Sequence, residues 1–160
     1  GEGASEELRL LLDLQAQYED ALYLSIHCNA LDDDSSVRGL QVYYLTGATA
    51  YARENELAVD RGLANAAPVY RMYQDESRRR LAGLVHESVL ERLPSLKYDG
   101  QKSLVDENYA VLRELNLTSV LIELGFISNV QDRNLLTDAA SQKQMAQGIA
   151  EAVYHYYCLP

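Results

Sequence analysis

The sequence predicts a three-layer α/β domain in which helices cover both faces of a largely parallel sheet. Short aliphatic runs alternate with longer amphipathic segments along the chain, and two of the short runs end on an ionisable side chain. The 160 residues, with a hydrophobic content of 48%, are sufficient for one core. Because there is no internal repeat and no linker, residues 1–160 are expected to form a single domain.

Two helices and two strands are expected in the first half of the chain. Leucines at helical spacing give residues 5–20 an amphipathic pattern. A strand over 22–26 follows, and an acidic loop at 32–34 separates it from a second strand over 40–45. The alanine-rich residues 46–67 are expected to be helical in part.

The second half is expected to begin with a helix that starts at Asp75 as a candidate cap, continues to about Arg92 and is ended by Pro94. Irregular polar chain is expected from there to about residue 109. Asn129 is expected to cap a short helix. The remaining expected elements are strands over 109–112 and 119–124 and a final helix over 140–157.

Charge and hydropathy argue against two classes of partner. A formal net charge of −10 disfavours nucleic acid and anionic membrane surfaces, since both bind basic faces. No apolar run approaches the ~20 residues that span a bilayer, and the sequence contains no signal peptide. Two cysteines, Cys28 and Cys158, are too few for a disulfide framework.

Two of the expected strands end on an ionisable side chain. Residues 23–26 run into His27, and residues 119–122 run into Glu123. Burying such groups is costly unless something compensates. In open α/β sheets, active sites are built at the carboxyl ends of strands. His27 and Glu123 are therefore the first candidate site residues.

Four segments around these residues form a recognisable series: Ser25–Ala30, Arg38-Gly39 before Tyr43-Tyr44, Val111–Arg113 and Leu121–Asn129. In order and rough spacing they resemble the zinc-dependent N-acetylmuramoyl-L-alanine amidases of the amidase-3 family. The resemblance extends from about residue 8 to the end of the chain, and its last segment is highly specific.

This resemblance implies a cell-wall hydrolase that cleaves the amide between N-acetylmuramic acid and the L-alanine of the stem peptide. His27 would be a zinc ligand, and Glu123 would be the catalytic glutamate that acts on the zinc-bound water. Asn29 and Arg38 are candidates for binding the substrate, with the turn after His27 as the favoured role of Asn29. Peptidoglycan as partner and an extracytoplasmic location follow from the same resemblance.

The sequence departs from the family at the metal site. It lacks two ligands that the family supplies upstream of His27, namely the histidine of a Gly-His-Gly-Gly turn and a glutamate that starts the first helix. Residues 5–20 align with the family's second helix, so the family's first strand, first helix and second strand are expected to be missing. A competing alignment makes residues 5–20 the first helix, with Glu6 or Glu7 as the carboxylate ligand. His86 and His155 are interpreted as ordinary helix residues, so we expect zinc to bind weakly or not at all.

Residues 47–58 resemble an insertion found in division-associated members of the family. In those proteins an inserted helix covers the active site, and a glutamate from it can occupy the zinc. Glu54 and Glu56 are the candidates for this autoinhibitory role, within a regulatory insert over about 46–74. An ordinary surface helix with solvated carboxylates is the favoured alternative.

Two classes of function stay open. The first is an amidase domain whose missing upstream part is supplied elsewhere, which the retention of His27 and Glu123 favours. The second is an inactive amidase-like module that binds cell-wall glycopeptide or a protein partner, which the missing ligands favour. Another zinc-peptidase use of the fold is a third. A vacant strand position would leave an open sheet edge, so we also expect a homodimer or an exchanged segment.

Overall fold

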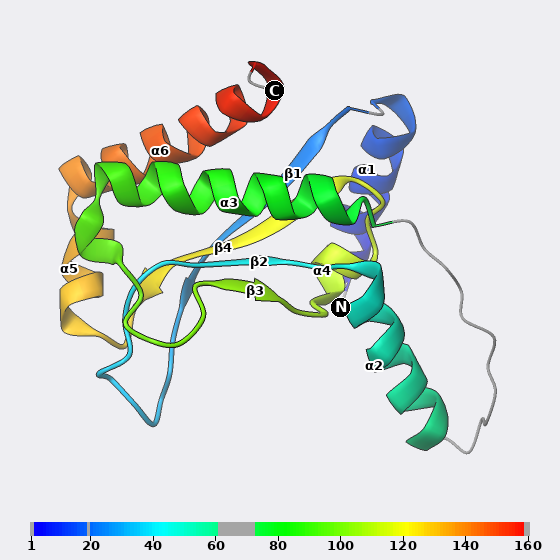
Figure 1. The fold of residues 1–160 in the computed structure, drawn as a ribbon, viewed down its shortest axis with the longest axis horizontal. Coiled ribbons are helices and arrows are strands. Elements are labelled where there is room, and N and C mark those ends of the chain that lie inside the picture. Colours follow the sequence, from blue (N-terminus) through cyan, green and yellow to red (C-terminus); the bar gives the residue numbers. More distant parts are fainter. Residues whose placement is uncertain (1, 19, 61–72, 159–160) are drawn as a thin grey trace.

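The computed structural model describes residues 2–18, 20–60 and 73–158. Helices and strands are interspersed along the described chain, as Figure 1 shows, and a short 3-10 helix forms at Pro94–Leu96. In chain order the elements are α1 (Glu2–Gln17), β1 (Leu22–Asn29), β2 (Gln41–Tyr44), α2 (Gly47–Asp60), α3 (Asp75–Arg92), β3 (Leu104–Asp106), α4 (Ala110–Arg113), β4 (Thr118–Phe126), α5 (Val130–Thr137) and α6 (Ala139–Cys158).

The strands form one sheet in the order β1-β4-β2-β3. β1 is parallel to β4, and β2 is parallel to β3, whereas β2 is antiparallel to β4. The predicted largely parallel sheet is therefore confirmed, with one antiparallel pair at its centre. Because β2 runs against β4, the carboxyl end of β4 lies beside the start of β2. Helix α2, which follows β2, consequently begins at the opposite end of the sheet (Figure 1).

Helices α3 and α6 lie side by side over one face of the sheet (Figure 1). They approach closely at Gly148, where an added Cβ would lie 2.8 Å from the Cα of Val89. Aliphatic side chains from both helices and from the sheet form the larger core of the protein. Its fully buried members include Leu40, Val42, Leu81, Val85, Val89, Val120, Ile122 and Met145.

A smaller core covers the other face of the sheet. Tyr43 and Leu121 of the sheet pack there with Leu112 of α4, Ala50 of α2 and Tyr73. Helices therefore flank the sheet on both faces, as the alternating sequence pattern predicts.

Strand β1 forms an edge of the sheet. Within the described residues it pairs with β4 on one side, and its other side is open. Ile26 in this strand is 53% exposed. The preceding helix α1 is amphipathic, as predicted, but exposes Leu10 and Leu12, while Gln15 accepts a hydrogen bond from the Asn116 backbone N–H. The described part of the sheet therefore has an open edge at β1.

The expected strand over 109–112 is wrong. Ala110–Arg113 form the short helix α4, and the strand of this region is β3, inside a stretch expected to be irregular. A four-residue aliphatic run does not distinguish strand from helix by periodicity. The helix is held in place by tertiary contacts, because Leu112 is buried and its carbonyl accepts a hydrogen bond from the buried Arg78 guanidinium. β1 also continues to Asn29, beyond its expected end at residue 26.

Candidate active site

His27 and Glu123 lie next to each other on neighbouring strands. They are partners in the parallel pairing of β1 with β4, so both side chains leave the same face of the sheet. Neighbouring strands are about 4.8 Å apart, which brings two such side chains within contact range. His27 is exposed and Glu123 is half-buried. The structure thus brings together the two residues that the sequence singles out.

The Glu123 carboxylate lacks a hydrogen bond that a buried oxygen normally has. Its Oε2 atom is buried and has no hydrogen-bond partner among the described residues. Burial raises the pKa of the Glu123 carboxyl, and the neighbouring His27 opposes this shift. A carboxyl group with a raised pKa exchanges a proton more readily near neutral pH, which is the property that a general base and acid requires.

Ser25 is a site residue that the sequence analysis missed. Its hydroxyl lies 2.8 Å from Nε2 of His27, and its side chain is buried. The hydrogen bond restrains the orientation of the imidazole ring. Since residues two apart in a strand share a face, the spacing from Ser25 to His27 is the signal that would have identified it.

Gln41 completes a row of polar residues across three strands. It is the antiparallel partner of Glu123 on β2 and is buried. Its amide Nε2 donates to the Lys102 carbonyl, and its Oε1 accepts from the Tyr43 hydroxyl. His27, Glu123 and Gln41 therefore lie in line on one face of the sheet. No local signal reveals Gln41, because its position depends on the antiparallel pairing of β2 with β4.

Asn29 fixes the turn after β1, which is its favoured role in the sequence analysis. Its Oδ1 accepts from the Ala30 backbone N–H, and its own carbonyl accepts from the Ile127 N–H. The predicted cap at Asn129 is confirmed, since its side chain accepts from two backbone N–H groups of α5. A contact between Asn29 and substrate stays a prediction.

The guanidinium of Arg38 is engaged within the protein. Nη2 donates to the Ser95 carbonyl at 2.6 Å, and Nε lies 3.3 Å from Oδ1 of Asp132. The side chain retains 24% exposure. Arg38 therefore braces the loop before β2, and its predicted role in substrate binding stays a prediction.

Glu56 is the proposed autoinhibitory residue whose side chain the structure describes. Glu56 is exposed and forms an ion pair with Arg53, on a helix that begins at the opposite end of the sheet (Figure 1). The side chains of Glu7 and Glu54, and residues 61–72 of the proposed insert, lie outside the described part of the chain. Autoinhibition by this segment stays a prediction.

The described residues do not fit a complete zinc site. Zinc prefers four ligands in a tetrahedral arrangement. Among the described residues, no group of three or more His, Cys, Asp or Glu side chains is placed to hold a metal ion. His86 and His155 lie in α3 and α6, the helices of the larger core. Cys28 follows His27 directly in β1, and adjacent side chains in a strand point to opposite faces, which disfavours joint ligation of a metal.

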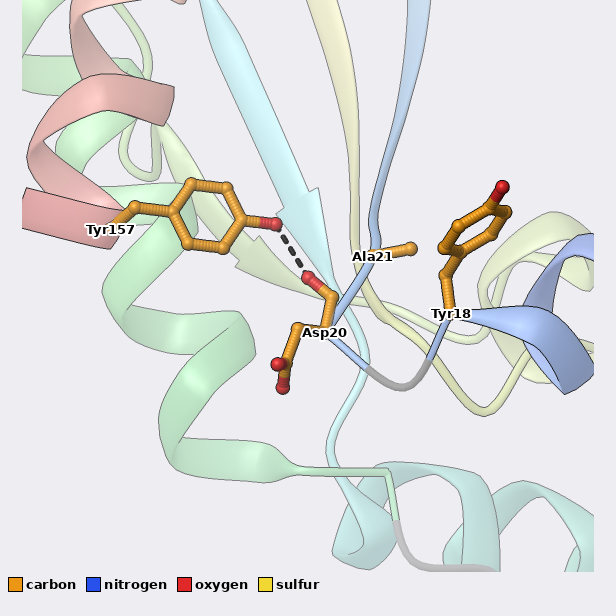
Figure 2. Close-up of a pocket in the computed structure, with 4 residues that line it drawn as sticks. All are labelled: Tyr18, Asp20, Ala21 and Tyr157. Atoms are coloured by element: carbon orange, nitrogen blue, oxygen red, sulfur yellow. Dashed lines mark hydrogen bonds between the residues drawn. The ribbon is translucent and has the colours of Figure 1, made fainter.

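A separate hollow lies at the amino end of β1, away from His27. Tyr18, Asp20, Ala21 and Tyr157 line it, and Figure 2 shows the ring of Tyr157 reaching across from α6. The Tyr157 hydroxyl donates to the Asp20 carbonyl at 2.5 Å. This contact ties the end of α6 to the start of β1 and involves neither candidate catalytic residue.

Solved N-acetylmuramoyl-L-alanine amidases share the fold. The enzyme from Clostridium difficile 630 superimposes with a TM-score of 0.65 at 24% identity, over 93% of this chain and 64% of that one. AmiC2 of Nostoc punctiforme gives a TM-score of 0.62 at 24% identity, over 90% and 62% of the two chains. The architecture is therefore that of the amidase class.

Residues 5–155 match the Amidase_3 family, described as N-acetylmuramoyl-L-alanine amidase, and the chain belongs to this family. It is 30% identical over 148 residues to the amidase AmiC of Neisseria meningitidis, covering 84% of this chain. It is 29% identical over 108 residues to the probable cell wall amidase LytH of Staphylococcus aureus, covering 68% of this chain. The chain spans 35% of the length of each relative.

None of the helices that the structure describes has the length and apolarity needed to cross a membrane.

Proposed function

We propose that this chain is the part of a peptidoglycan amidase that carries the catalytic Glu123 and the site histidine His27. The reaction is hydrolysis of the amide between N-acetylmuramic acid and the L-alanine of the stem peptide, outside the cytoplasm. Membership of the amidase family supports the reaction. The in-register pairing of His27 with Glu123 is the observation that carries the assignment of the residues.

Glu123 is proposed to move a proton between water and the leaving group. The oxygen of the water attacks the amide carbonyl carbon while the Glu123 carboxylate accepts the proton of the water. The carbon–nitrogen bond then breaks, and the same carboxyl group returns the proton to the leaving amine. The raised pKa of Glu123 and its unpartnered, buried Oε2 among the described residues support both halves of this exchange.

His27 is the residue of this chain that we assign to the family's zinc. A zinc ion needs further ligands, and the described residues do not supply them. We therefore propose that the remaining ligands come from outside the described residues, and that residues 1–160 form a single domain. The open edge of β1 is where another chain, in a homodimer or an exchanged segment, would pair. A monodisperse monomer in light scattering would count against a homodimer.

A second candidate is a module that binds without hydrolysis. The incomplete set of metal ligands among the described residues favours it. A similar solved structure, the CwlD amidase from Clostridioides difficile, is a complex with the GerS lipoprotein. By analogy, this chain would bind cell-wall glycopeptide or a protein partner.

Metal content and release of peptide from peptidoglycan, measured on the same samples, separate the two candidates. Glu123→Gln is expected to lower kcat by about 10²–10⁴-fold, because it removes the proton acceptor. Glu107→Gln, which changes an exposed carboxylate, is the matched control and is expected to keep full activity. Activity that survives in Glu123→Gln would overturn the role of Glu123. No zinc and no release by the unmodified chain, assayed together with the segment that supplies the remaining ligands, would favour the binding module.

A further inference from the structure

The carboxylate of Asp132 joins two segments that are distant in the sequence. The side chain is fully buried in the first turn of α5. Oδ2 accepts from the backbone N–H of Gly39 at 2.6 Å and from that of Phe126 at 3.0 Å. Oδ1 lies 3.3 Å from Nε of Arg38. One carboxylate therefore holds both the end of β4 and the turn that leads into β2.

These bonds are not needed to cap α5. Asn129 already supplies the cap, since its Oδ1 accepts from the backbone N–H groups of Gln131 and Asp132. The Asp132 carboxylate is thus directed across the chain to its three donors. Hydrogen bonds to a charged group are stronger than those between neutral groups, which favours a single arrangement of the segments they join.

The β4 segment that Asp132 holds is a β-bulge. His27 pairs with Glu123, but Asn29 pairs with Phe126, so β4 has one more residue than β1 between the two pairs. Gly125 in the bulge has a φ of +140°, and an added Cβ would lie 3.0 Å from Oδ2 of Asp132. The glycine two residues after Glu123 therefore permits both the backbone conformation and the close approach of the carboxylate.

We propose that Asp132 is a positioning residue for Glu123, and that it acts by fixing this bulge. A shift of one residue in a strand turns its side chains to the opposite face. By holding the Phe126 N–H, Asp132 limits such a shift at the end of β4 and keeps Glu123 in register with His27. The inference rests on the proposed function of Glu123.

Hydrogen exchange at backbone amides tests the structural part of this inference without any need for activity. In Asp132→Asn, exchange at Gly39 and Phe126 is expected to accelerate about tenfold, because their charged acceptor is lost. Ile127 is the decisive position, since its N–H donates to Asn29 on β1 and not to Asp132. Its exchange is expected to accelerate as well, while that of Val85 in α3 stays unchanged.

Asp138→Asn is the matched control. Asp138 also accepts from a backbone N–H, that of Ser141, but at the start of α6. This variant is expected to leave the exchange of Ile127 unchanged. Normal protection of Ile127 in Asp132→Asn would show that Asp132 stabilises only its own contacts, and would overturn the inference.

The kinetic readout is the release of peptide from peptidoglycan by the same variants. Asp132→Asn is expected to lower kcat about tenfold or more, with a smaller change in KM, since it misplaces Glu123. Full kcat together with a loosened Ile127 would overturn the positioning role. If the unmodified chain releases nothing even with the remaining ligands supplied, the proposed function fails, and the exchange data still decide whether Asp132 fixes the bulge.

Arg38→Ala tests the same inference if Asp132→Asn does not fold. It removes one of the three donors and leaves the carboxylate with both backbone N–H groups. A smaller acceleration at Ile127, about threefold, is expected from the weakened anchor. Unchanged exchange at Ile127 in a folded Arg38→Ala would contradict the inference.

Discussion

Two ionisable side chains near opposite ends of β4, those of Arg78 and Glu123, differ in how their buried polar atoms are satisfied. At the amino end, the fully buried guanidinium of Arg78 donates to the carbonyls of Leu112, Leu115 and Leu117. At the carboxyl end, Oε2 of Glu123 is buried and has no partner among the described residues. Buried polar groups are nearly always satisfied, so an unsatisfied group calls for an explanation. The difference indicates that Arg78 serves stability, and it agrees with the proposed catalytic role of Glu123.

Backbone carbonyl oxygens that accept its hydrogen bonds stabilise the buried guanidinium of Arg78. The charge lies 5.1 Å from the centre of the Tyr73 ring, which adds a favourable cation–π contact. Burial lowers the pKa of the guanidinium to about 10, so it still carries its charge at neutral pH. Removal of the side chain would leave several buried carbonyl oxygens without a donor.

Arg78→Met is therefore expected to have the largest effect on stability. We expect the free energy of unfolding to fall by about 3–5 kcal/mol, because each unsatisfied buried carbonyl costs about 1–3 kcal/mol. Urea denaturation measures this change. Arg79→Met, which alters the exposed neighbour, is the control and is expected to cost less than about 1 kcal/mol. A loss below about 1 kcal/mol in Arg78→Met would remove the contrast between the two ends of β4.

The sequence predicts the helix that carries Arg78 but not the burial of Arg78. The bounds of α3, Asp75–Arg92, follow from helical spacing and from Pro94, which are local signals. Arg78 stands among other arginines in a polar turn, and an arginine in such a context is normally solvated. Its burial depends on carbonyl groups that the fold delivers from residues 112–117.

At the candidate site, the sequence identifies the residues but not their arrangement. His27 and Glu123 stand out because each ends an aliphatic run. Their register, and the antiparallel approach of Gln41, depend on strand pairing between distant segments. Asp132 resembles an ordinary acidic residue in the first turn of a helix, which the helix dipole alone would favour. Its three donors become visible only in three dimensions.

A pair of glycine substitutions tests how tightly the α3 side of the sheet is packed. Gly148→Ala would place a methyl group 2.8 Å from the Cα of Val89 and 2.9 Å from the Ser88 carbonyl oxygen, and both belong to backbone. We expect it to lower the free energy of unfolding by about 1–3 kcal/mol, since α6 must move away from α3. Gly83→Ala in α3 meets nothing within 4 Å and is expected to raise it by up to about 1 kcal/mol. Equal effects of the two substitutions in urea denaturation would contradict close packing at Gly148.

The smallest expected effect on the free energy of unfolding is a gain on replacing Glu123, near the carboxyl end of β4. Because the pKa of Glu123 is raised in the folded state, ionising this group opposes folding. Glu123→Gln is therefore expected to raise the free energy of unfolding at pH 7. The gain should shrink as the pH falls through the raised pKa, and it should vanish well below the usual value of 4.5, where the carboxyl group is neutral in both states.

Urea denaturation at pH 7 and at acidic pH measures this gain. Glu107→Gln is the matched control, because it removes one exposed negative charge from a chain of net charge −10 and so reports the general effect of lower charge. A gain at pH 7 no larger than that of Glu107→Gln would contradict the view that Glu123 is held at a cost. A larger gain, combined with lost activity, would show that the carboxyl end of β4 gives up stability for a reactive carboxylate, as strained or unsatisfied active-site groups commonly do.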